Sequence, residues 1–265
     1  MMAMPILSRV VRQTPLRWYL PNKIVRQELI QLAIDRLAAR TYVEIGVDEG
    51  QSFCAVNVPT KIGIDPVPAF PAVERELSKP GVFYQAMTSD HFFATTARQT
   101  LADGIDVAFV DGLHTYGQTF RDLSNCLEHL NPGGIILVHD CLPTSAEEAR
   151  VAETYDEACR LNGPSWNGLW TGDGWKAIAA LRAQRPDVVA NVINCDHGVG
   201  VVYRGTNDAG VSLTQAAIDG LSYQDLAGRT AELIGLRRPI HLLSALGRLR
   251  ELRRPLSGDH PRRIS

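Results

Sequence analysis

Four ionisable side chains follow two short apolar runs of the sequence. Asp111 and His114 come after the first run, and His139 and Asp140 come directly after the second. Taken singly, an Asp or a His after a strand more often caps a helix or bonds a turn. Ligands, however, bind at the carboxyl edge of an open parallel sheet, where these four would meet. Two carboxylates and two imidazoles together predict a divalent-metal and general-base site.

The stretch from Ile105 to Cys141 predicts the strand, helix and strand that position these side chains. Val107 to Val110 and Ile135 to Val138 are continuous apolar runs, typical of strands buried on both faces of a parallel sheet. Between them, apolar residues recur at helical spacing, at Phe120, Leu123, Leu127 and Leu130. Asn131 to Gly134 reads as the helix stop, because glycine takes the left-handed cap and proline cannot continue the helix.

Composition bounds the class of protein. A chain of 265 residues with 45% hydrophobic residues fits one large α/β domain with appendages, and a net charge of −2 gives no case for nucleic acid or membrane. Arg9, Arg12 and Arg17 interrupt the apolar residues of the N-terminal stretch, so no signal peptide or membrane span is expected. The five cysteines lack Cys-x-x-Cys spacing, which predicts a soluble protein in a reducing, cytoplasmic setting.

A glycine loop follows the first predicted strand, Thr41 to Val47. Gly46 and Gly50 lie four apart at a helix start, where the backbone approaches a ligand closely and free amides can hold a carboxylate or phosphate. The spacing is not the Gly-x-Gly-x-x-Gly of dinucleotide enzymes. Asp65 ends the second strand 19 residues after Gly46, where a carboxylate can accept both hydroxyls of a ribose.

Ser89 and Asp90 follow the third predicted strand, Val82 to Met87. They lie where an adenine would be bounded or where a helix is merely capped, and capping is favoured for each of them singly.

These motifs together resemble the class I S-adenosylmethionine-dependent methyltransferases, from about Tyr42 to Gly205. The similarity is carried by Glu44-x-Gly46-x-x-x-Gly50, Asp65, the run Val-Asp-Gly-Leu-His114 and the Asn-Pro-Gly-Gly before an apolar strand. More narrowly, Phe109 to Tyr116, Gly172 to Ala177 and Asp196 to Val201 resemble small O-methyltransferases of glycan and natural-product biosynthesis. Among these, the actinobacterial sugar methyltransferases of methylmannose polysaccharide are the suggested relatives.

The resemblance implies a fold and a division of the chain. The fold is a three-layer αβα, Rossmann-like α/β architecture with a seven-stranded, mostly parallel sheet that ends in an antiparallel hairpin. Asp187 to Cys195 and Val199 to Tyr203 supply the hairpin signal. The expected parts are an N-terminal arm and covering helix over residues 1–40, a catalytic domain over 41–205 with a lid insertion over 142–175, and a helical basic extension over 206–265.

The resemblance also implies residue roles. The residues expected to contact S-adenosylmethionine are Glu44, Gly46, Gly50, Ser52, Asp65, Ser89, Asp90 and Asp111. In metal-dependent relatives an Asp after the fourth strand and an acidic pair after the fifth bind magnesium. Those positions correspond to Asp111, His139 and Asp140, and His139 stands where an acid is common. This departure leaves open the third ligand and the choice between magnesium and manganese.

The predicted lid carries three tryptophans among glycines, with a helix expected from Glu147 to Leu161. Flat rings over a strand-exit edge suit a bulky acceptor such as a sugar, although pinning the loop to the core is an equal explanation for each ring. The residues expected to contact the acceptor are Tyr116, Trp166, Trp170 and Asp173. Trp175 to Leu181 reads as the start of a helix that packs on the sheet.

The predicted activity is methyl transfer from S-adenosylmethionine to a hydroxyl of a small molecule or oligosaccharide, with sugar favoured over phenol. A divalent ion on Asp111 and Asp140 would lower the pKa of the hydroxyl, and His114 is the expected general base. The alternatives are a metal-free enzyme in which His114 acts alone, a binding protein without turnover, and a nicotinamide oxidoreductase. The arginine-rich C-terminal segment favours a dimer or lid contact over nucleic-acid binding.

Overall fold

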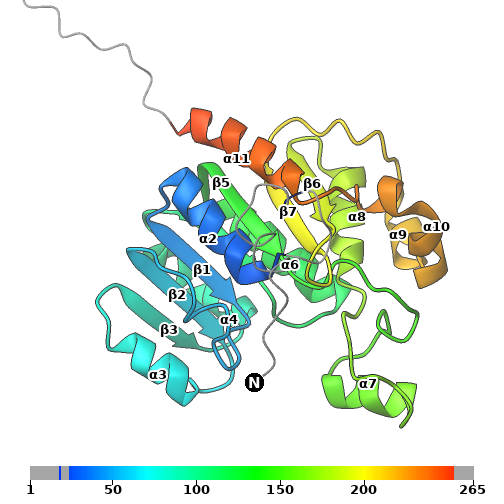
Figure 1. Cartoon of the computed structure of the whole chain (residues 1–265), viewed down its shortest axis with the longest axis horizontal. Coiled ribbons are helices and arrows are strands. Elements are labelled where there is room, and N and C mark those ends of the chain that lie inside the picture. The colour runs from blue at the N-terminus through cyan, green and yellow to red at the C-terminus, as the bar shows by residue number, and fades with distance from the viewer. Residues whose placement is uncertain (1–17, 19–23, 254–265) are drawn as a thin grey trace, which may run out of the picture.

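The computed structural model describes residues 18 and 24–253. The strands are β1 (Thr41–Ile45), β2 (Thr60–Asp65), β3 (Val82–Ala86), β4 (Ile105–Val110), β5 (Leu130–Val138), β6 (Val188–Ile193) and β7 (Val199–Arg204). The helices labelled in Figure 1 are α2 (Arg26–Leu37), α3 (Pro71–Leu77), α4 (Ser89–Thr95), α6 (Tyr116–His129), α7 (Tyr155–Asn162), α8 (Trp175–Gln184), α9 (Gln215–Asp219), α10 (Tyr223–Leu233) and α11 (Ile240–Leu252), and the short α5 (Ala97–Thr100) follows α4.

The seven strands form one sheet in the order β3-β2-β1-β4-β5-β7-β6. All neighbours pair in parallel except β7, which is antiparallel to both β5 and β6. Helices α2 and α11 lie against one face, and α4, α6 and α8 against the other (Figure 1). The three-layer αβα architecture and its terminal antiparallel hairpin are therefore confirmed.

The central strands are apolar on both sides because both faces of the sheet are covered. In β4, Val107 and Phe109 pack with the residues of α2 and α11, and Ala108 and Val110 pack with those of α6 and α8. All six residues of β4 are buried. This burial explains why the sequence shows a continuous apolar run rather than an alternating one.

The helix ends directly before Asn131 to Gly134, as predicted, but the predicted glycine cap is wrong, because the C-cap residue is Leu130 in an extended conformation. Helix α6 ends at His129 and β5 begins at Leu130, so these residues lie inside the strand, where the pairing register with β4 shifts. At Gly133 the backbone has φ +72°, and an added Cβ would lie 2.6 Å from the carbonyl oxygen of Leu249 in α11. Glycine is needed there because α11 packs closely on the start of β5.

The lid contains less helix than expected. Helix α7 covers Tyr155–Asn162, whereas the residues around Glu147 form only turns. Thr154 caps α7, since its side chain accepts a hydrogen bond from the Glu157 amide, and this cap fixes the later start. Figure 1 shows α7 set apart from the three layers. The expected helix start at Trp175 is confirmed by α8.

The N-terminal arm falls mostly outside the described residues, except Trp18, which is buried. At the other end of the chain, α11 packs on β5 and α2 and so belongs to a layer of the fold. The division at residues 40, 205 and 206 stays a prediction. Among the described residues, no helix combines the length and apolar character that crossing a membrane requires.

A buried lysine fixes the segment after the glycine loop, and it gives a test of the fold. The Lys61 side chain is 2% exposed, and its Nζ donates to the carbonyl oxygens of Phe53 (2.7 Å) and Val56 (2.8 Å) and to Glu76 Oε1 (2.8 Å). We expect Lys61→Met to cost about 3 kcal/mol of unfolding free energy, because it removes one partner of a buried pair. Lys79 also pairs with Glu76 but is 60% exposed, so Lys79→Met should cost under about 1 kcal/mol. Urea unfolding of both variants measures the difference, and equal losses would contradict it.

Candidate active site

Backbone hydrogen bonds bring the predicted residues together at the carboxyl edge of the sheet. The Asp111 amide donates to the Ile45 carbonyl of β1 (2.8 Å), and the His139 amide donates to the Val110 carbonyl of β4 (2.9 Å). Because Val110 pairs with Val138 in the ladder, the residues that follow these two strands are neighbours. Asp111 and His139 are therefore held in register by the sheet itself.

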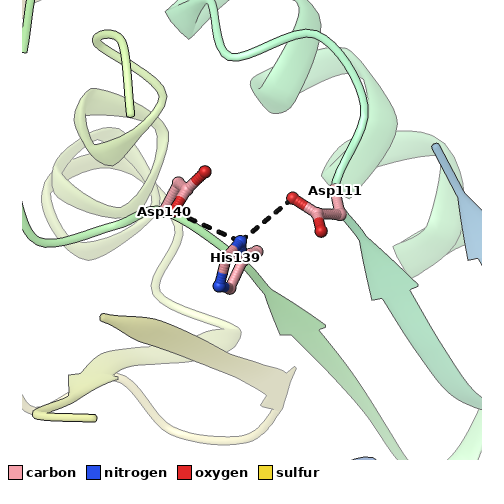
Figure 2. A group of neighbouring side chains, drawn as sticks. All are labelled: Asp111, His139 and Asp140. Atoms are coloured by element: carbon pink, nitrogen blue, oxygen red, sulfur yellow. Dashed lines mark hydrogen bonds and ion pairs between the residues drawn. The ribbon is translucent and has the colours of Figure 1, made fainter. Parts of the chain in front are cut away.

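Asp111, His139 and Asp140 point toward one another (Figure 2). The His139 Nδ1 lies 3.1 Å from Asp111 Oδ1 and 3.2 Å from Asp140 Oδ1. His114 completes the group, since its Nδ1 is 3.4 Å from Asp140 Oδ2 and its Nε2 is 3.6 Å from Asp111 Oδ1. All four residues predicted to share a site thus lie together.

The charges of this cluster depend on one another. Burial raises the pKa of Asp111, but the His139 and His114 rings outweigh this and hold that pKa well below its usual range. Burial lowers the pKa of His139, but Asp111, with Asp140 and Asp196, raises it well above the ordinary value. The carboxylates and the imidazole rings therefore each favour the charged form of the other.

The lid wraps closely around His114. The His114 carbonyl accepts hydrogen bonds from the amides of Asp173 (3.1 Å) and Gly174 (3.2 Å). The ring Nδ1 is 3.1 Å from the Trp170 carbonyl oxygen, and the two rings lie 5.1 Å apart. Because a carbonyl can only accept, Nδ1 carries the proton and Nε2 keeps its lone pair in the neutral ring. At Gly172, with φ +60°, an added Cβ would lie 2.0 Å from the His114 oxygen, so only glycine permits this contact.

A polar cavity of about 310 Å³ opens beside the cluster. It is lined by Arg26, Glu44, Gly46, Val47, Asp48, Gln51, Ser52, Asp111, His114, His139 and Asp140. Arg26, which sequence reasoning missed, begins α2, and its Nη1 is 3.2 Å from His139 Nε2. A guanidinium can only donate, so in this contact Nε2 must accept and the His139 ring is neutral. The hydrogen bond from Arg26 thus holds the neutral ring, whereas the carboxylates favour its protonation.

Asp196 is a second residue that sequence reasoning did not assign to the site. Its carboxylate accepts a hydrogen bond from the Arg26 amide (2.6 Å) and lies 3.9 Å from His139 Nε2. Asp196 and His197 occupy the β6–β7 turn with φ +42° and +59°, positions where Asn and Gly are normally preferred. This unusual choice of turn residues was the sequence feature that could have indicated a functional role for Asp196. Arg26 had no such signal, because a polar residue at a helix start is ordinary.

A second, more apolar cavity of about 480 Å³ shares Gly46, Asp48 and Asp111 with the first. Its lining residues are Ile45, Gly46, Asp48, Ile64, Asp65, Pro66, Thr88, Ser89, Asp90, Asp111, Gly112, Leu113, Gln118 and Asp122. Ser89 and Asp90 both receive the Gln118 side-chain amide, at 3.1 and 3.2 Å, whereas the cap of α4 is Thr88. Sequence reasoning missed Asp122, a buried acid whose pKa is raised to about 6 by that burial.

Gly46 and Asp48 of the glycine loop line both cavities, and Asp65 lines the apolar one. Asp65 Oδ2 accepts the amides of Val47 (2.9 Å) and Asp48 (3.0 Å), and Oδ1 accepts the amide of Val67 (2.8 Å). A carboxylate offers about four lone-pair positions, so Asp65 both fixes the loop and retains acceptor capacity for a ligand. At Gly46, with φ +82°, an added Cβ would lie 2.2 Å from the Asp111 carbonyl oxygen. Gly46 thus lets β1 and β4 exits approach each other.

Two of the expected loop residues lie on the side of α2 and α3. At Gly50, with φ +82°, an added Cβ would lie 2.6 Å from Val73 Cγ2, so this glycine serves packing against α3. Ser52 is buried and its Oγ is 3.3 Å from Arg26 Nε, within the polar cavity.

The residues predicted to contact an acceptor are dispersed. Trp166 lies 5.9 Å from the Tyr155 ring and lines a separate hollow on α7, so the structure does not bring it to His114. Asp173 is engaged by the Tyr116 amide (2.7 Å) and by Lys176 (3.2 Å), and the Tyr116 hydroxyl accepts a hydrogen bond from Gln215 (2.9 Å). Trp170 is the one ring of this group that lies beside the His114 ring, tilted by 36°. The role of each toward an acceptor stays a prediction.

Part of the chain is similar to known proteins. Residues 43–141 match the family model described as a methyltransferase domain, which is fewer than half of the residues of the chain. A protein of Acanthamoeba polyphaga mimivirus, described as uncharacterized protein R132, is 32% identical over 113 residues, or 38% of this chain. That alignment covers 51% of the viral protein, so the chain spans about half the length of this curated relative.

Solved structures with a similar course of the chain include two O-methyltransferases. The enzyme from Bacillus cereus in complex with SAH is 15% identical, with a TM-score of 0.48, over 77% of this chain and 93% of that one. TomG from Streptomyces achromogenes, in complex with SAM, is 19% identical, with a TM-score of 0.49, over 77% and 92%. Residues 43–141 are thus similar to a methyltransferase domain, and they lie in a seven-stranded sheet with a terminal antiparallel hairpin.

Glu44 gives a pH test of the polar cavity. It is 1% exposed, its Oε2 accepts the Tyr42 hydroxyl (2.5 Å), and burial raises its pKa from 4.5 to about 8. Between these two values the folded protein keeps the Glu44 proton that the unfolded chain releases. The contribution of Glu44 to stability is therefore complete below pH 4.5 and is lost as the pH rises toward 8. We expect this residue to contribute a loss of about 1.4 kcal/mol per pH unit in that window, which Glu44→Gln removes. Urea unfolding at several pH values measures it, and parallel profiles for both proteins would contradict the assignment.

Proposed function

We propose that this chain is an S-adenosylmethionine-dependent O-methyltransferase that acts on a hydroxylated small molecule or oligosaccharide. One observation carries the proposal. Asp111, His114, His139 and Asp140 converge beside a polar cavity that shares Gly46, Asp48 and Asp111 with a second cavity over the glycine loop. Ligand binding at the carboxyl edge of a parallel sheet is the general rule for such folds.

The two cavities divide the cofactor between them. The apolar cavity suits the adenosine, with Asp65 for the ribose hydroxyls and Ser89, Asp90 and Gln118 at its far end. The polar cavity then takes the amino-acid end, next to Glu44 and Ser52. The cavities share Gly46, Asp48 and Asp111, so the methyl-bearing sulfur would lie near Asp111 and the histidines.

His114 is the proposed general base. Its Nδ1 is held by the Trp170 carbonyl, which leaves the Nε2 lone pair for the acceptor proton. The flanking carboxylates and this carbonyl outweigh burial and raise the pKa of His114, which favours proton uptake from a hydroxyl. Once protonated, the ring stays stabilised by Asp111 and Asp140. Transfer itself is an in-line displacement that mainly requires the two reactants to be positioned.

The residues Asp111, His139 and Asp140 fit a divalent ion. Their ligand atoms lie within 4.8 Å of one another. Neighbouring ligands at right angles on an ion, with bonds of roughly 2.1 Å, are about 3 Å apart, and the His139 Nδ1 lies 3.1 and 3.2 Å from the two oxygens. If Nδ1 were a ligand, the ring proton would have to be on Nε2, and the hydrogen bond from Arg26 would be lost, while Asp196, 3.9 Å from Nε2, would be the nearby carboxylate.

A bound magnesium or manganese ion would lower the pKa of an acceptor hydroxyl, and the imidazole favours manganese. The alternative within this class is a metal-independent enzyme in which His114 acts alone and the aspartates orient the acceptor. A non-catalytic cofactor-binding protein would have no use for the His114 arrangement. We also propose a sugar or glycan acceptor, as in polysaccharide biosynthesis, with Trp170 as its aromatic contact at the site. A homodimer and a cytoplasmic location are further proposals.

The deciding experiment is calorimetry followed by turnover. Titration with S-adenosylmethionine, S-adenosylhomocysteine and NAD separates a methyltransferase from an oxidoreductase. A screen of glycan and phenolic acceptors with radiolabelled cofactor then measures transfer. Cofactor binding without transfer to any hydroxylated acceptor would favour the non-catalytic alternative, and binding of NAD alone would overturn the proposal.

The metal assignment predicts manganese binding that depends on the cluster. We expect the wild type to bind Mn²⁺, detected as loss of the free-ion electron paramagnetic resonance signal, and Asp140→Asn to weaken that binding at least about tenfold. Asp187→Asn is the matched control, because that carboxylate is 51% exposed and pairs with Arg185 at the start of β6. Equal Mn²⁺ affinity in Asp140→Asn and the control would remove the metal site and leave the metal-independent version.

The base assignment predicts a separate loss. His114→Gln should lower the transfer rate by about 10² to 10⁴, the range for losing a positioned general base, while Mn²⁺ still binds. His129→Gln is the control. His129 ends α6, and its ring is stacked on that of Phe93 in α4. Single-turnover rates measure the effect, and full activity in His114→Gln would transfer the role to another group.

A further inference from the structure

Arg26 enters the polar cavity from α2, an element that precedes the glycine loop in the chain. Its Nε is 3.3 Å from Ser52 Oγ, and its Nη1 is 3.2 Å from His139 Nε2. The side chain is 20% exposed, and the guanidinium belongs to the cavity lining. A cation is thus held at the boundary between the glycine loop and the ionisable cluster.

The guanidinium keeps unused donor capacity. Its approaches to Asp111 (3.8 Å) and Asp196 (3.7 Å) are too long for hydrogen bonds. Among residues 18 and 24–253, Nη2 has no hydrogen-bond partner. An arginine has five N–H donors in a planar fork that matches a carboxylate with two parallel bonds. Asp111 and Asp196 stabilise the positive charge of Arg26 but leave its Nη2 donors available for a ligand.

The ligand chemistry follows from the cavity's charges. An amino-acid end carries one ammonium and one carboxylate, so its site needs acidic and basic partners. Asp111 supplies the acid, the protonated Glu44 offers a neutral acceptor oxygen, and Arg26 is the one lining residue with a permanent positive charge in the described cavity. Ser52, on the glycine loop, accepts a hydrogen bond from Arg26 Nε and so holds the guanidinium next to that loop.

We propose that Arg26 binds the α-carboxylate of the cofactor's amino-acid end and so selects cofactors that carry this group. The inference rests on the proposed function, because it assumes that the nucleoside lies in the adjoining cavity. A carboxylate on the acceptor is the other source of the same chemistry. The contact between Arg26 and Ser52 favours the cofactor, since the glycine loop is the wall shared by both cavities.

The experiment compares two ligands that differ by the amino-acid end. S-adenosylhomocysteine carries it, and 5′-methylthioadenosine lacks it. Arg26→Gln should weaken S-adenosylhomocysteine about ten- to a hundredfold in calorimetry, the effect of losing a charge-assisted pair, and leave 5′-methylthioadenosine within about twofold. Arg26→Lys, which keeps charge without the fork, should fall between the two proteins. Arg36→Gln, on the exposed last turn of the same helix, is the matched control and should match the wild type for both ligands.

The outcomes separate this inference from the proposed function. Unchanged S-adenosylhomocysteine affinity in Arg26→Gln would overturn the inference, whether the carboxylate belongs to an acceptor or to no ligand. An equal loss for both ligands, or a melting temperature well below that of Arg36→Gln, would also overturn it, because the residue would then be structural. Failure of the wild type to bind S-adenosylhomocysteine would instead overturn the proposed function itself.

Discussion

The backbone ladder across β1, β4 and β5 is the constraint on which the site depends. Its hydrogen bonds continue one residue past the strands, from Asp111 to Ile45 and from His139 to Val110. A shift of either strand by one residue would turn the neighbouring side chains to the opposite face. Burial of both faces of these strands fixes the register, so the position of the ionisable cluster is a consequence of how the core packs.

Once the ladder has brought carboxylates together, their repulsion must be balanced. The rings of His114 and His139 and the guanidinium of Arg26 provide that balance. A divalent ion on the same carboxylates would be a further means, and it would require the His139 proton to change nitrogen. On the proposal above, the cofactor's carboxylate would bind the Arg26 donors that Ser52 and His139 leave unused. A bound cofactor, a bound ion and the His139 tautomer would then influence one another through a few hydrogen bonds.

The lid acts on the site mainly through its backbone. Carbonyl and amide groups from Trp170 to Gly174 fix the ring and the main chain of His114, and Gly172 has the conformation that this approach requires. Asp173 joins the same segment to the start of α6 through the Tyr116 amide. Residues expected to touch an acceptor thus serve first to orient His114. Helix α7 and Trp166 lie beyond this anchored segment.

The sequence by itself determined the αβα class, the terminal hairpin and the meeting of Asp111, His114, His139 and Asp140. Continuous apolar runs and glycine positions are local signals, and parallel strands place their ends at one edge. The tertiary structure decided what depends on packing between distant segments. It assigned Gly133 to the contact with α11 instead of a helix cap, separated Trp166 from Trp170, and brought Arg26 and Asp196 to His139. No local pattern encodes such contacts, because they arise where α2 and the β6–β7 turn, 170 residues apart, pack over the same sheet edge.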